Sequence, residues 1–317
     1  MTDIALSVVM PSYNDGAWLR RAVESVLSKA AAVPGLELLL IDDASTDAAT
    51  VAVQDALAAA HPEQLRLLRL PQNGGPARAR NAGIAAARGT WIAFLDADDH
   101  WLPGGLAARW DVVRQYPGAE FIGTDYRLEN AAGEPEPEAF NASRPRPRAL
   151  LQAAYASGQV LCLPRPVGAF VHAMLCWTGA VTVRAGLLRA VGGFPVDLAQ
   201  GEDDHLWLQL ARRADFYYLP RITAAYVQRA GSLTADGSAP GHWKLQSLTR
   251  LLADPDVAPW HGALRRRLAD LHRQEATYHR HQGDRRQAVQ AALQSLRAQP
   301  AALANWLTLA KAVGRVG

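Results

Sequence analysis

Residues 90–99 read Thr90-Trp-Ile-Ala-Phe-Leu-Asp-Ala-Asp-Asp99, an apolar run that ends in three acidic side chains. An uninterrupted apolar run of this length is typical of a strand buried on both faces, as in a parallel sheet. The acidic side chains follow the carboxyl end of that strand, which is where ligands bind in open α/β sheets. The stretch therefore predicts a fold class and also the place where chemistry is expected.

Toward the N-terminus, three more strands are expected at 6–10, 36–41 and 65–70, and each is followed by polar residues. The stretches between them predict helices. Apolar side chains recur at helical spacing over residues 16–30, and Thr46 is a candidate N-cap for a second helix. A third helix is expected between Pro76 and Gly89, residue types that are common at a helix start and end. Strands that alternate with helices indicate a parallel α/β sheet.

Toward the C-terminus, a fifth strand is expected at 119–124, and residues 130–166 then become polar and proline-rich, which predicts a surface excursion. A second structured block follows, with strands expected at 177–183 and 222–227 and a helix at 204–213. From His242 onward the apolar spacing predicts only helices.

These elements predict an α/β fold with a Rossmann-like, mostly parallel sheet flanked by helices and an all-helical C-terminal extension. We expect one domain over 1–238, divided at about 125/126, and helices over 239–317.

Composition sets limits on the class of protein. The chain has 317 residues, 49% hydrophobic and 20% charged, and its two cysteines fit a reducing compartment. Because the start lacks a basic and then apolar leader and no apolar run reaches ~18 residues, we expect a cytoplasmic protein. Residues 240–317 carry 12 Lys and Arg against 5 Asp and Glu. This charge predicts either a solvated helical surface or peripheral contact with anionic lipid at the inner face of the cell membrane. No nucleic-acid-binding motif accompanies it, so we expect no nucleic-acid partner.

Four polar clusters are expected at one edge of the sheet, since each follows a predicted strand. They are Pro11-Ser-Tyr-Asn14, Asp42-Asp-Ala-Ser-Thr-Asp47, Asn73-Gly-Gly-Pro-Ala-Arg-Ala-Arg-Asn-Ala-Gly83 and Asp96-Ala-Asp-Asp99. Each one alone is also common as a turn, a helix cap or a solvated acidic pair. Their coincidence at one sheet edge is what favours a binding cleft.

The side chains in these clusters suit a nucleotide diphosphate. Tyr13 offers a ring face for a nucleobase, and Asp42 or Asp43 can accept hydrogen bonds from a base or a ribose. Arg78 and Arg80 can pair with diphosphate oxygens. The hard carboxylate oxygens of Asp96 and Asp98 suit Mg²⁺ or Mn²⁺ that already holds a diphosphate.

In this order, the clusters resemble those of glycosyltransferase family 2, which has the GT-A fold. The family also shows Gly-Gly-Phe, here Gly192-Gly-Phe194, and an acidic pair before a Leu-Trp helix, here Gly201-Glu-Asp-Asp-His-Leu-Trp207. The resemblance covers about residues 4–235, and its motifs are specific for the family but not for the substrate. It implies that the domain at 1–238 is catalytic, with a nucleotide-binding half at about 1–125 and an acceptor half at about 126–238.

The resemblance implies a role for each matching position. Tyr13 would stack on the base, usually uracil, and Asp43 with Asp42 would contact base and ribose. Asp96 would lie near the ribose and the metal, and Asp98 would bind the metal. Asp203 would be the general base, and Glu202 would position the acceptor sugar. The other motif positions expected to bind the nucleotide are Pro11, Asn14, Arg78, Arg80 and Asn81.

One segment departs from the family pattern. Members often have Tyr-Arg-x-His-x-Gly-Ser after the last sheet strand, whereas this chain has Tyr226-Val-Gln-Arg-Ala-Gly-Ser232. Arg229 stands where the family has histidine. Because a guanidinium cannot ligate a cation but can pair with phosphate oxygens, Arg229 is expected to supplement the metal's charge on the leaving group.

The resulting expectation is an inverting glycosyltransferase that moves a sugar from a nucleotide sugar, most simply a UDP-sugar, to a saccharide or lipid-linked acceptor in cell-surface polysaccharide or glycoconjugate synthesis. A dehydrogenase would need Gly-x-Gly-x-x-Gly after the first strand, which Pro11-Ser-Tyr-Asn-Asp-Gly16 does not provide. A catalytically inactive relative that only binds a partner remains the alternative.

Overall fold

The computed structural model describes residues 4–136, 138–198, 200–229 and 242–314. The chain divides into two compact units, one of Met1–Asp197 with Leu206–Arg229 and one of Leu198–His205 with Ala230–Gly317. The expected domain boundary at 238/239 lies outside the described residues and stays a prediction. We call the first unit the sheet unit and the second the helical unit.

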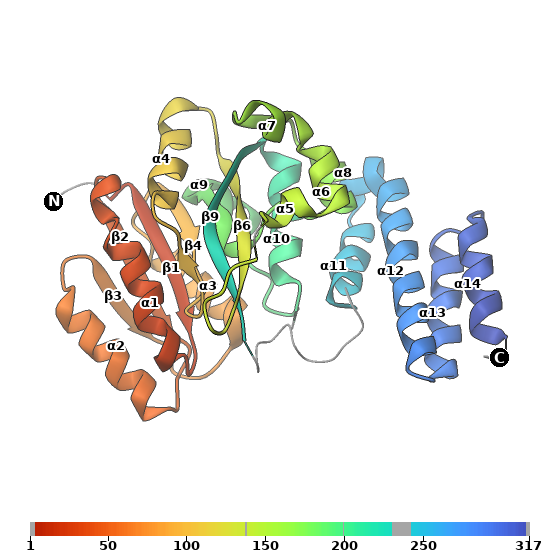
Figure 1. The fold of residues 1–317 in the computed structure, drawn as a ribbon, viewed down its shortest axis with the longest axis horizontal. Helices are drawn as coiled ribbons and strands as arrows, with labels where there is room; N and C mark the ends of the chain where they lie inside the picture. Colours follow the sequence, from red (N-terminus) through yellow and green to blue (C-terminus); the bar gives the residue numbers. More distant parts are fainter. Residues whose placement is uncertain (1–3, 137, 199, 230–241, 315–317) are drawn as a thin grey trace. The chain divides into compact units, whose positions relative to one another are not determined.

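The sheet unit is built on one nine-stranded mixed sheet in the order β3-β2-β1-β4-β8-β6-β9-β5, with β7 paired to β9 (Figure 1). The strands are β1 (Leu6–Ser12), β2 (Leu36–Asp42), β3 (Leu65–Arg69), β4 (Trp91–Phe94), β5 (His100–Trp101), β6 (Phe121–Asn130), β7 (Leu161–Leu163), β8 (Val181–Arg184) and β9 (Phe216–Gln228). Strands β3, β2, β1 and β4 are parallel neighbours, as the sequence predicts. Beyond β4 the sheet is mixed: β8 runs antiparallel to both β4 and β6, whereas β6 and β9 are parallel.

Helices cover both faces of this sheet. They are α1 (Gly16–Leu27), α2 (Ala48–Ala60), α3 (Gly75–Ala86), α4 (Gly105–Gln115), α5 (Phe140–Ser143), α6 (Pro145–Leu150), α7 (Gln152–Ser157), α8 (Val167–His172), α9 (Ala185–Val191) and α10 (Glu202–Arg213), with the 3₁₀ turns η1 (Ala30–Ala32) and η2 (Thr178–Ala180). α1 and α2 lie on one face of the parallel strands and α3 on the other (Figure 1), as right-handed crossovers from a strand order of 3-2-1-4 require.

Strand alternation divides the core between the two faces. Ala93 and Ile122 point into the cluster formed with α1 and α4. Their neighbours Phe94 and Phe121 point to the opposite face, where each packs against the fully buried Trp207 of α10. The site-bearing strands are therefore fixed by apolar packing from both sides.

Three local predictions differ from the structure. The strand expected at 177–183 is shorter, since residues 178–180 form η2 and only 181–184 form β8. The N-cap of α2 is Asp47, not Thr46, because the Asp47 carboxylate accepts the backbone N–H groups of Ala49 and Thr50. The excursion at 130–166 is also more ordered than expected, since it contains α5, α6, α7 and β7.

Buried polar contacts hold that excursion against the sheet. The fully buried carboxylate of Asp125 on β6 accepts the hydroxyl of Tyr155 at 2.6 Å and the backbone N–H of Asn141 at 2.9 Å. The Tyr155 hydroxyl also lies 2.8 Å from that of Tyr218 on β9. Burial and the Asp125 charge raise the pKa of both tyrosines, so their hydroxyls stay protonated as donors.

The helical unit contains α11 (His242–Leu252), the 3₁₀ turn η4 (Pro255–Trp260), α12 (His261–His281), α13 (Arg285–Ala298) and α14 (Leu303–Val313). Leu264, Leu268 and Leu271 form a buried stripe on α12. The apolar residues of α14 behave differently, since Leu303 is 72% exposed and Trp306 is 55% exposed. Among the described residues, no helix combines the length and the apolar character needed to cross a bilayer.

Candidate active site

The predicted polar clusters lie at one edge of the sheet. β2, β1 and β4 are adjacent and parallel, so residues 42–47, 11–15 and 96–99 leave the sheet at the same end. The cluster at 73–83 follows the next strand along, β3, and forms the start of α3. The fold thus brings together segments that the sequence separates by up to ~90 residues, which is the arrangement expected of a ligand cleft.

The first two clusters are bonded directly to each other. The Asn14 side-chain oxygen accepts the backbone N–H groups of Thr46 at 2.9 Å and Asp47 at 3.0 Å. Asn14 adopts a left-handed backbone with φ 57°, a conformation that asparagine tolerates better than most residues. Next to it, Tyr13 is 44% exposed, whereas Pro11 is buried within β1. Tyr13 is therefore the residue of this cluster with a ring available to a ligand.

The adjacent carboxylates of Asp42 and Asp43 are both only 3% exposed and have internal partners. Asp42 accepts from the Gln54 side-chain amide at 3.1 Å. Asp43 accepts the backbone N–H groups of Gly74 at 2.9 Å and Gly75 at 2.7 Å, which fixes the loop before α3. Gly75 has φ 80°, which explains a glycine there. Direct contact of Asp42 and Asp43 with a base or ribose stays a prediction.

The two arginines expected to pair with diphosphate are placed differently. Arg78 is exposed on the first turn of α3. Arg80 is only 5% exposed, and its Nη2 donates to both oxygens of Asp96, at 2.8 and 3.0 Å. The next residue, Asn81, bonds to the backbone of Phe194 through both its oxygen and its nitrogen. Arg80 and Asn81 thus contact the chain itself, and their contacts with a nucleotide stay predictions.

Asp98 lies in an ion-pair bridge that includes a residue missed by the sequence analysis. Arg229 donates through Nε to Asp98 at 2.7 Å and through Nη2 to Asp15 at 2.8 Å. Asp15 precedes α1 and looks in the sequence like an N-cap, yet its carboxylate makes no cap hydrogen bond to that helix. Instead, its second oxygen accepts the backbone N–H of Tyr13 at 2.9 Å. Residues 230–232, the rest of the motif that contains Arg229, lie outside the described residues.

Burial and mutual repulsion shift the pKa values of these carboxyl groups upward. Burial raises the pKa of Asp15 from 3.8 to about 6, and the charge of Asp98 adds to the rise, although Tyr13 N–H and Arg229 oppose it. Burial and then the charge of Asp96 raise the pKa of Asp98. Asp99 is fully buried, with a pKa raised well above its ordinary value, and it accepts the backbone N–H of Val227 at 2.8 Å. Burial is the largest cause of all three rises, and the charges of neighbouring carboxylates add to it.

The donor set of the Asp96-Ala-Asp98 turn suits a divalent cation. Its carboxylate oxygens are the hard ligands that Mg²⁺ and Mn²⁺ prefer. Across the parts of the chain described by the structure, no group of three or more His, Cys, Asp or Glu side chains is arranged to hold a metal ion. One or two carboxylates are typical of a cation that takes its other ligands from water and substrate phosphates.

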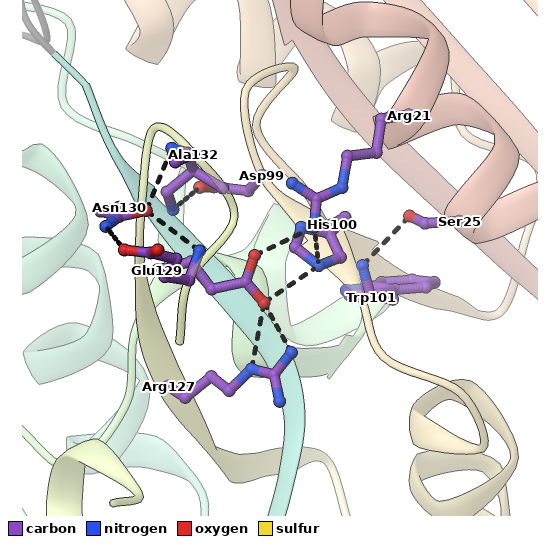
Figure 2. Close-up of polar contacts among 11 residues, drawn as sticks. Arg21, Ser25, Asp99, His100, Trp101, Arg127, Glu129, Asn130 and Ala132 are labelled. Carbon is purple, nitrogen blue, oxygen red and sulfur yellow. Dashed lines mark hydrogen bonds and ion pairs between the residues drawn. The ribbon is translucent and has the colours of Figure 1, made fainter. Parts of the chain in front are cut away.

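A second charge cluster includes His100, two residues after Asp98 in the chain (Figure 2). Glu129 on β6, which is 1% exposed, accepts from Arg127 at 2.6 Å and from Arg21 of α1 at 2.9 Å. The Nε2 of His100 accepts from the same Arg21 group at 2.8 Å. Burial lowers the pKa of His100 from 6.5 to about 4, with help from the two arginine charges and against the Glu129 charge. His100 is therefore neutral near pH 7.

The two acidic residues expected to act on the acceptor, Glu202 and Asp203, lie at the start of α10. Glu202, Asp203 and Asp204 form its first turn, where carboxylates interact favourably with the helix dipole. The Asp203 carboxylate accepts the N–H of Asp204 at 2.7 Å, and Asp204 pairs with Lys244 at 3.1 Å. Asp203 belongs to the segment that groups with the helical unit, so the prediction that it shares a pocket with Asp98 remains untested.

Comparison with known proteins agrees with this geometry. The model of the family described as Glycosyl transferase family 2 matches residues 7–146, which hold the four clusters. The succinoglycan biosynthesis protein ExoO of Rhizobium meliloti is 43% identical over 102 residues, which cover 32% of this chain and 27% of ExoO. Over residues 7–146 the chain is similar to glycosyltransferase family 2. It spans half or less of the length of the curated family relatives it matches.

Solved structures support the GT-A fold of the family. Residues 1–349 of TarS from S. aureus, in complex with UDP-GlcNAc, align with a TM-score of 0.61 and 18% identity, covering 93% of this chain and 81% of TarS 1–349. The mannosyltransferase PcManGT from Pyrobaculum calidifontis, in complex with GDP-Man and Mn²⁺, aligns with a TM-score of 0.56 and 19% identity, covering 98% of this chain and 82% of PcManGT. At this identity the likeness shows the fold alone and leaves the substrate open.

Proposed function

We propose that the protein transfers a sugar from a nucleotide-sugar donor, most simply a UDP-sugar, to a saccharide or lipid-linked acceptor, with inversion at the anomeric carbon. The main support is the gathering of the family 2 clusters at one sheet edge, with an exposed Tyr13 beside the acidic Asp96-Ala-Asp98 turn. The succinoglycan biosynthesis relative supports a role in making polysaccharide or glycoconjugate.

The donor would lie over the carboxyl ends of β1, β2 and β4. Tyr13 would stack on the base, because its ring is the exposed aromatic surface of that edge. Arg78 at the start of α3 is exposed and would approach the diphosphate, and Arg229 would pair with it once released from Asp98. Asp98, with Asp96, would hold a Mg²⁺ or Mn²⁺ ion, which when bound neutralises charge on the departing diphosphate.

The acceptor would be activated by Asp203, with Glu202 positioning it. As the acceptor oxygen attacks the anomeric carbon, its proton would pass to the Asp203 carboxylate while the bond to the diphosphate breaks. A positioned general base of this kind contributes roughly 10²–10⁴-fold to the rate. Because the attack comes from the side opposite the leaving group, an α-linked donor gives a β-linked product.

A donor screen tests the activity itself. Purified protein is mixed with Mn²⁺, an acceptor mixture and one of UDP-Glc, UDP-Gal, UDP-GlcNAc or GDP-Man, and nucleotide release and new glycans are measured by mass spectrometry. Release that depends on both the metal and the acceptor, with one donor preferred, is the expected result. If the protein binds UDP but releases nucleotide from no donor, it is an inactive binding relative.

A second experiment tests the general base. Asp203→Asn should bind UDP as wild type does and lose roughly 10²–10⁴-fold in kcat. Asp204→Asn is the matched control, since the neighbouring acid pairs with Lys244 instead and its loss should leave kcat within a few-fold of wild type. Equal kcat values for Asp203→Asn and wild type would exclude Asp203 as the base.

For the helical unit we propose peripheral contact with an anionic membrane surface. The segment 240–317 has seven more basic than acidic residues, and α14 exposes Leu303, Trp306 and Leu307. The indole N–H of Trp306 donates to the Pro300 carbonyl at 2.9 Å, so its exposed surface is apolar. Full-length protein should co-sediment with vesicles containing phosphatidylglycerol and not with pure phosphatidylcholine, and Trp306→Ser should weaken this. Equal sedimentation with both vesicle types would contradict the proposal.

A further inference from the structure

Asn81 on α3 is bonded to a loop more than a hundred residues away. Its side-chain nitrogen donates to the Phe194 carbonyl at 2.7 Å, and its side-chain oxygen accepts the Phe194 N–H at 2.8 Å. The carboxamide thus pairs with both backbone polar groups of a single residue, as a neighbouring strand would. Because both the nitrogen and the oxygen of the carboxamide are bonded, the Phe194 backbone is held at its N–H and at its carbonyl.

The glycine before Phe194 permits this close approach. Gly193 has φ 72°, and a Cβ there would lie 2.4 Å from the Asn81 side-chain oxygen. Any side chain would therefore strain the backbone and also displace Asn81. The glycine of the Gly192-Gly-Phe194 motif is thus explained by its contact with α3.

The Phe194 ring, which is 2% exposed, contacts three elements of the sheet unit. It packs edge-to-face on Phe94 at the end of β4, with ring centroids 5.2 Å apart. It packs in the same way on Trp207 of α10, at 5.8 Å. The Arg80 guanidinium of α3 lies 5.3 Å from the ring centroid.

Each of these partners is close in the chain to a group of the proposed chemistry. Arg80 donates to both oxygens of Asp96. Phe94 is the last residue of β4 and lies two positions before Asp96. Trp207 lies one helical turn after Asp203 in α10. A displacement of Phe194 would therefore act on the Asp96-Ala-Asp98 turn and on α10 together.

We propose that Asn81 is a positioning residue that acts through Phe194 to fix the Asp96-Ala-Asp98 turn and α10 for sugar transfer. Asn81 does this without touching substrate, although the family motif that contains it would place it in the nucleotide site. The expected loss of kcat rests on the proposed function, whereas the expected change in the structure of the turn and of α10 does not.

The test compares Asn81→Ala with a matched control, Asn305→Ala. Asn305 is also a buried asparagine that donates to backbone carbonyls, those of Ser295 and Gln299, but it lies in the helical unit. Because misplacing reacting groups by about 1 Å costs roughly 10²-fold, Asn81→Ala should lower kcat by roughly 10- to 100-fold while the Kd for UDP changes by less than about 3-fold. Asn305→Ala should leave both values near wild type. Gly193→Ala, which perturbs the contact from its other side, should resemble Asn81→Ala.

Amide hydrogen exchange supplies a readout that needs no activity. In Asn81→Ala, exchange should become faster in residues 95–99 and in α10, and in Asn305→Ala these segments should match wild type. Unchanged exchange there, or a kcat equal to that of Asn305→Ala, would overturn the inference. If wild type turns over no donor, the proposed function fails and the exchange data alone decide the role of Asn81.

Discussion

Replacing His100 with glutamine tests the electrostatics of the charge cluster around it. Burial and the charges of Arg21 and Arg127 lower the pKa of His100 from 6.5 to about 4, against the pull of Glu129. A depressed folded-state pKa means that His100 contributes stability above pH 6.5 that is lost as the pH falls toward 4. In His100→Gln this contribution is absent, while the glutamine oxygen can still accept from Arg21.

The magnitude follows from linkage between the two pKa values. When the pH falls from 7.5 to 5.0, the free energy of unfolding of wild type should decrease by about 2 kcal/mol more than that of His100→Gln. The reason is that His100 becomes protonated in the unfolded chain but not in the folded one. The two proteins must be compared at each pH, because Asp15 acts oppositely. Its pKa, raised from 3.8 to about 6, contributes stability that is present at low pH and lost as the pH rises through 6.

Urea unfolding at pH 7.5 and pH 5.0, followed by circular dichroism, measures this difference. Histidine NMR gives an independent check, since the ring signal that disappears in His100→Gln should not titrate above pH 5. His281→Gln, which removes an exposed histidine at the end of α12, is the control and should keep the His100 contribution. A wild-type minus His100→Gln difference that is equal at both pH values, or a titration midpoint near 6.5, would refute the burial argument.

Three further predictions concern the site and its support. Thr50→Val should destabilise the sheet unit by about 1–3 kcal/mol in urea unfolding, because the buried Thr50 hydroxyl accepts the Gly16 N–H at 2.9 Å and valine leaves that donor unpaired; an unchanged midpoint would contradict this. Tyr13→Ala should weaken UDP binding by roughly 3- to 10-fold in calorimetry, the loss expected for one stacked ring, and equal affinity would exclude stacking. In the absence of nucleotide, Arg229→Gln should tighten Mn²⁺ binding by roughly tenfold, because it removes a positive charge from beside Asp98. Electron paramagnetic resonance measures this affinity, and Arg114→Gln, which removes an exposed arginine, is the control. Weaker Mn²⁺ binding in Arg229→Gln would contradict the argument.

Much of the fold could be predicted because its strongest signals are local. Residues 6–10, 36–41, 65–70 and 90–95 are short, mainly apolar stretches, and all four contribute to parallel strands. The short strand β5 could not be predicted in this way. His100 and Trp101 form a strand only because they pair with Ala225 and Ala224, more than a hundred residues later.

The site was predictable in its location but less so in its contacts. Each cluster directly follows a predicted strand in the sequence, and the carboxyl ends of parallel strands lie at one edge of the sheet. The partners of individual side chains depend on distant loops, so the Asn81 bond to Phe194 could not be inferred from spacing. Asp15 was overlooked for the same reason, because an aspartate before a helix looks like an N-cap until its bond to Arg229 is known.

The bonds from Asn14 to Thr46 and Asp47 have a consequence for engineering the enzyme. They join the loops after β1 and β2 into one rigid unit, although about thirty residues separate these loops in the chain. A chimera that takes only one of these loops from a relative with another nucleotide preference would break the join between them. Loops 11–15 and 42–47 should therefore be exchanged as a pair, because a library that varies them separately would mostly lose the bonds between them.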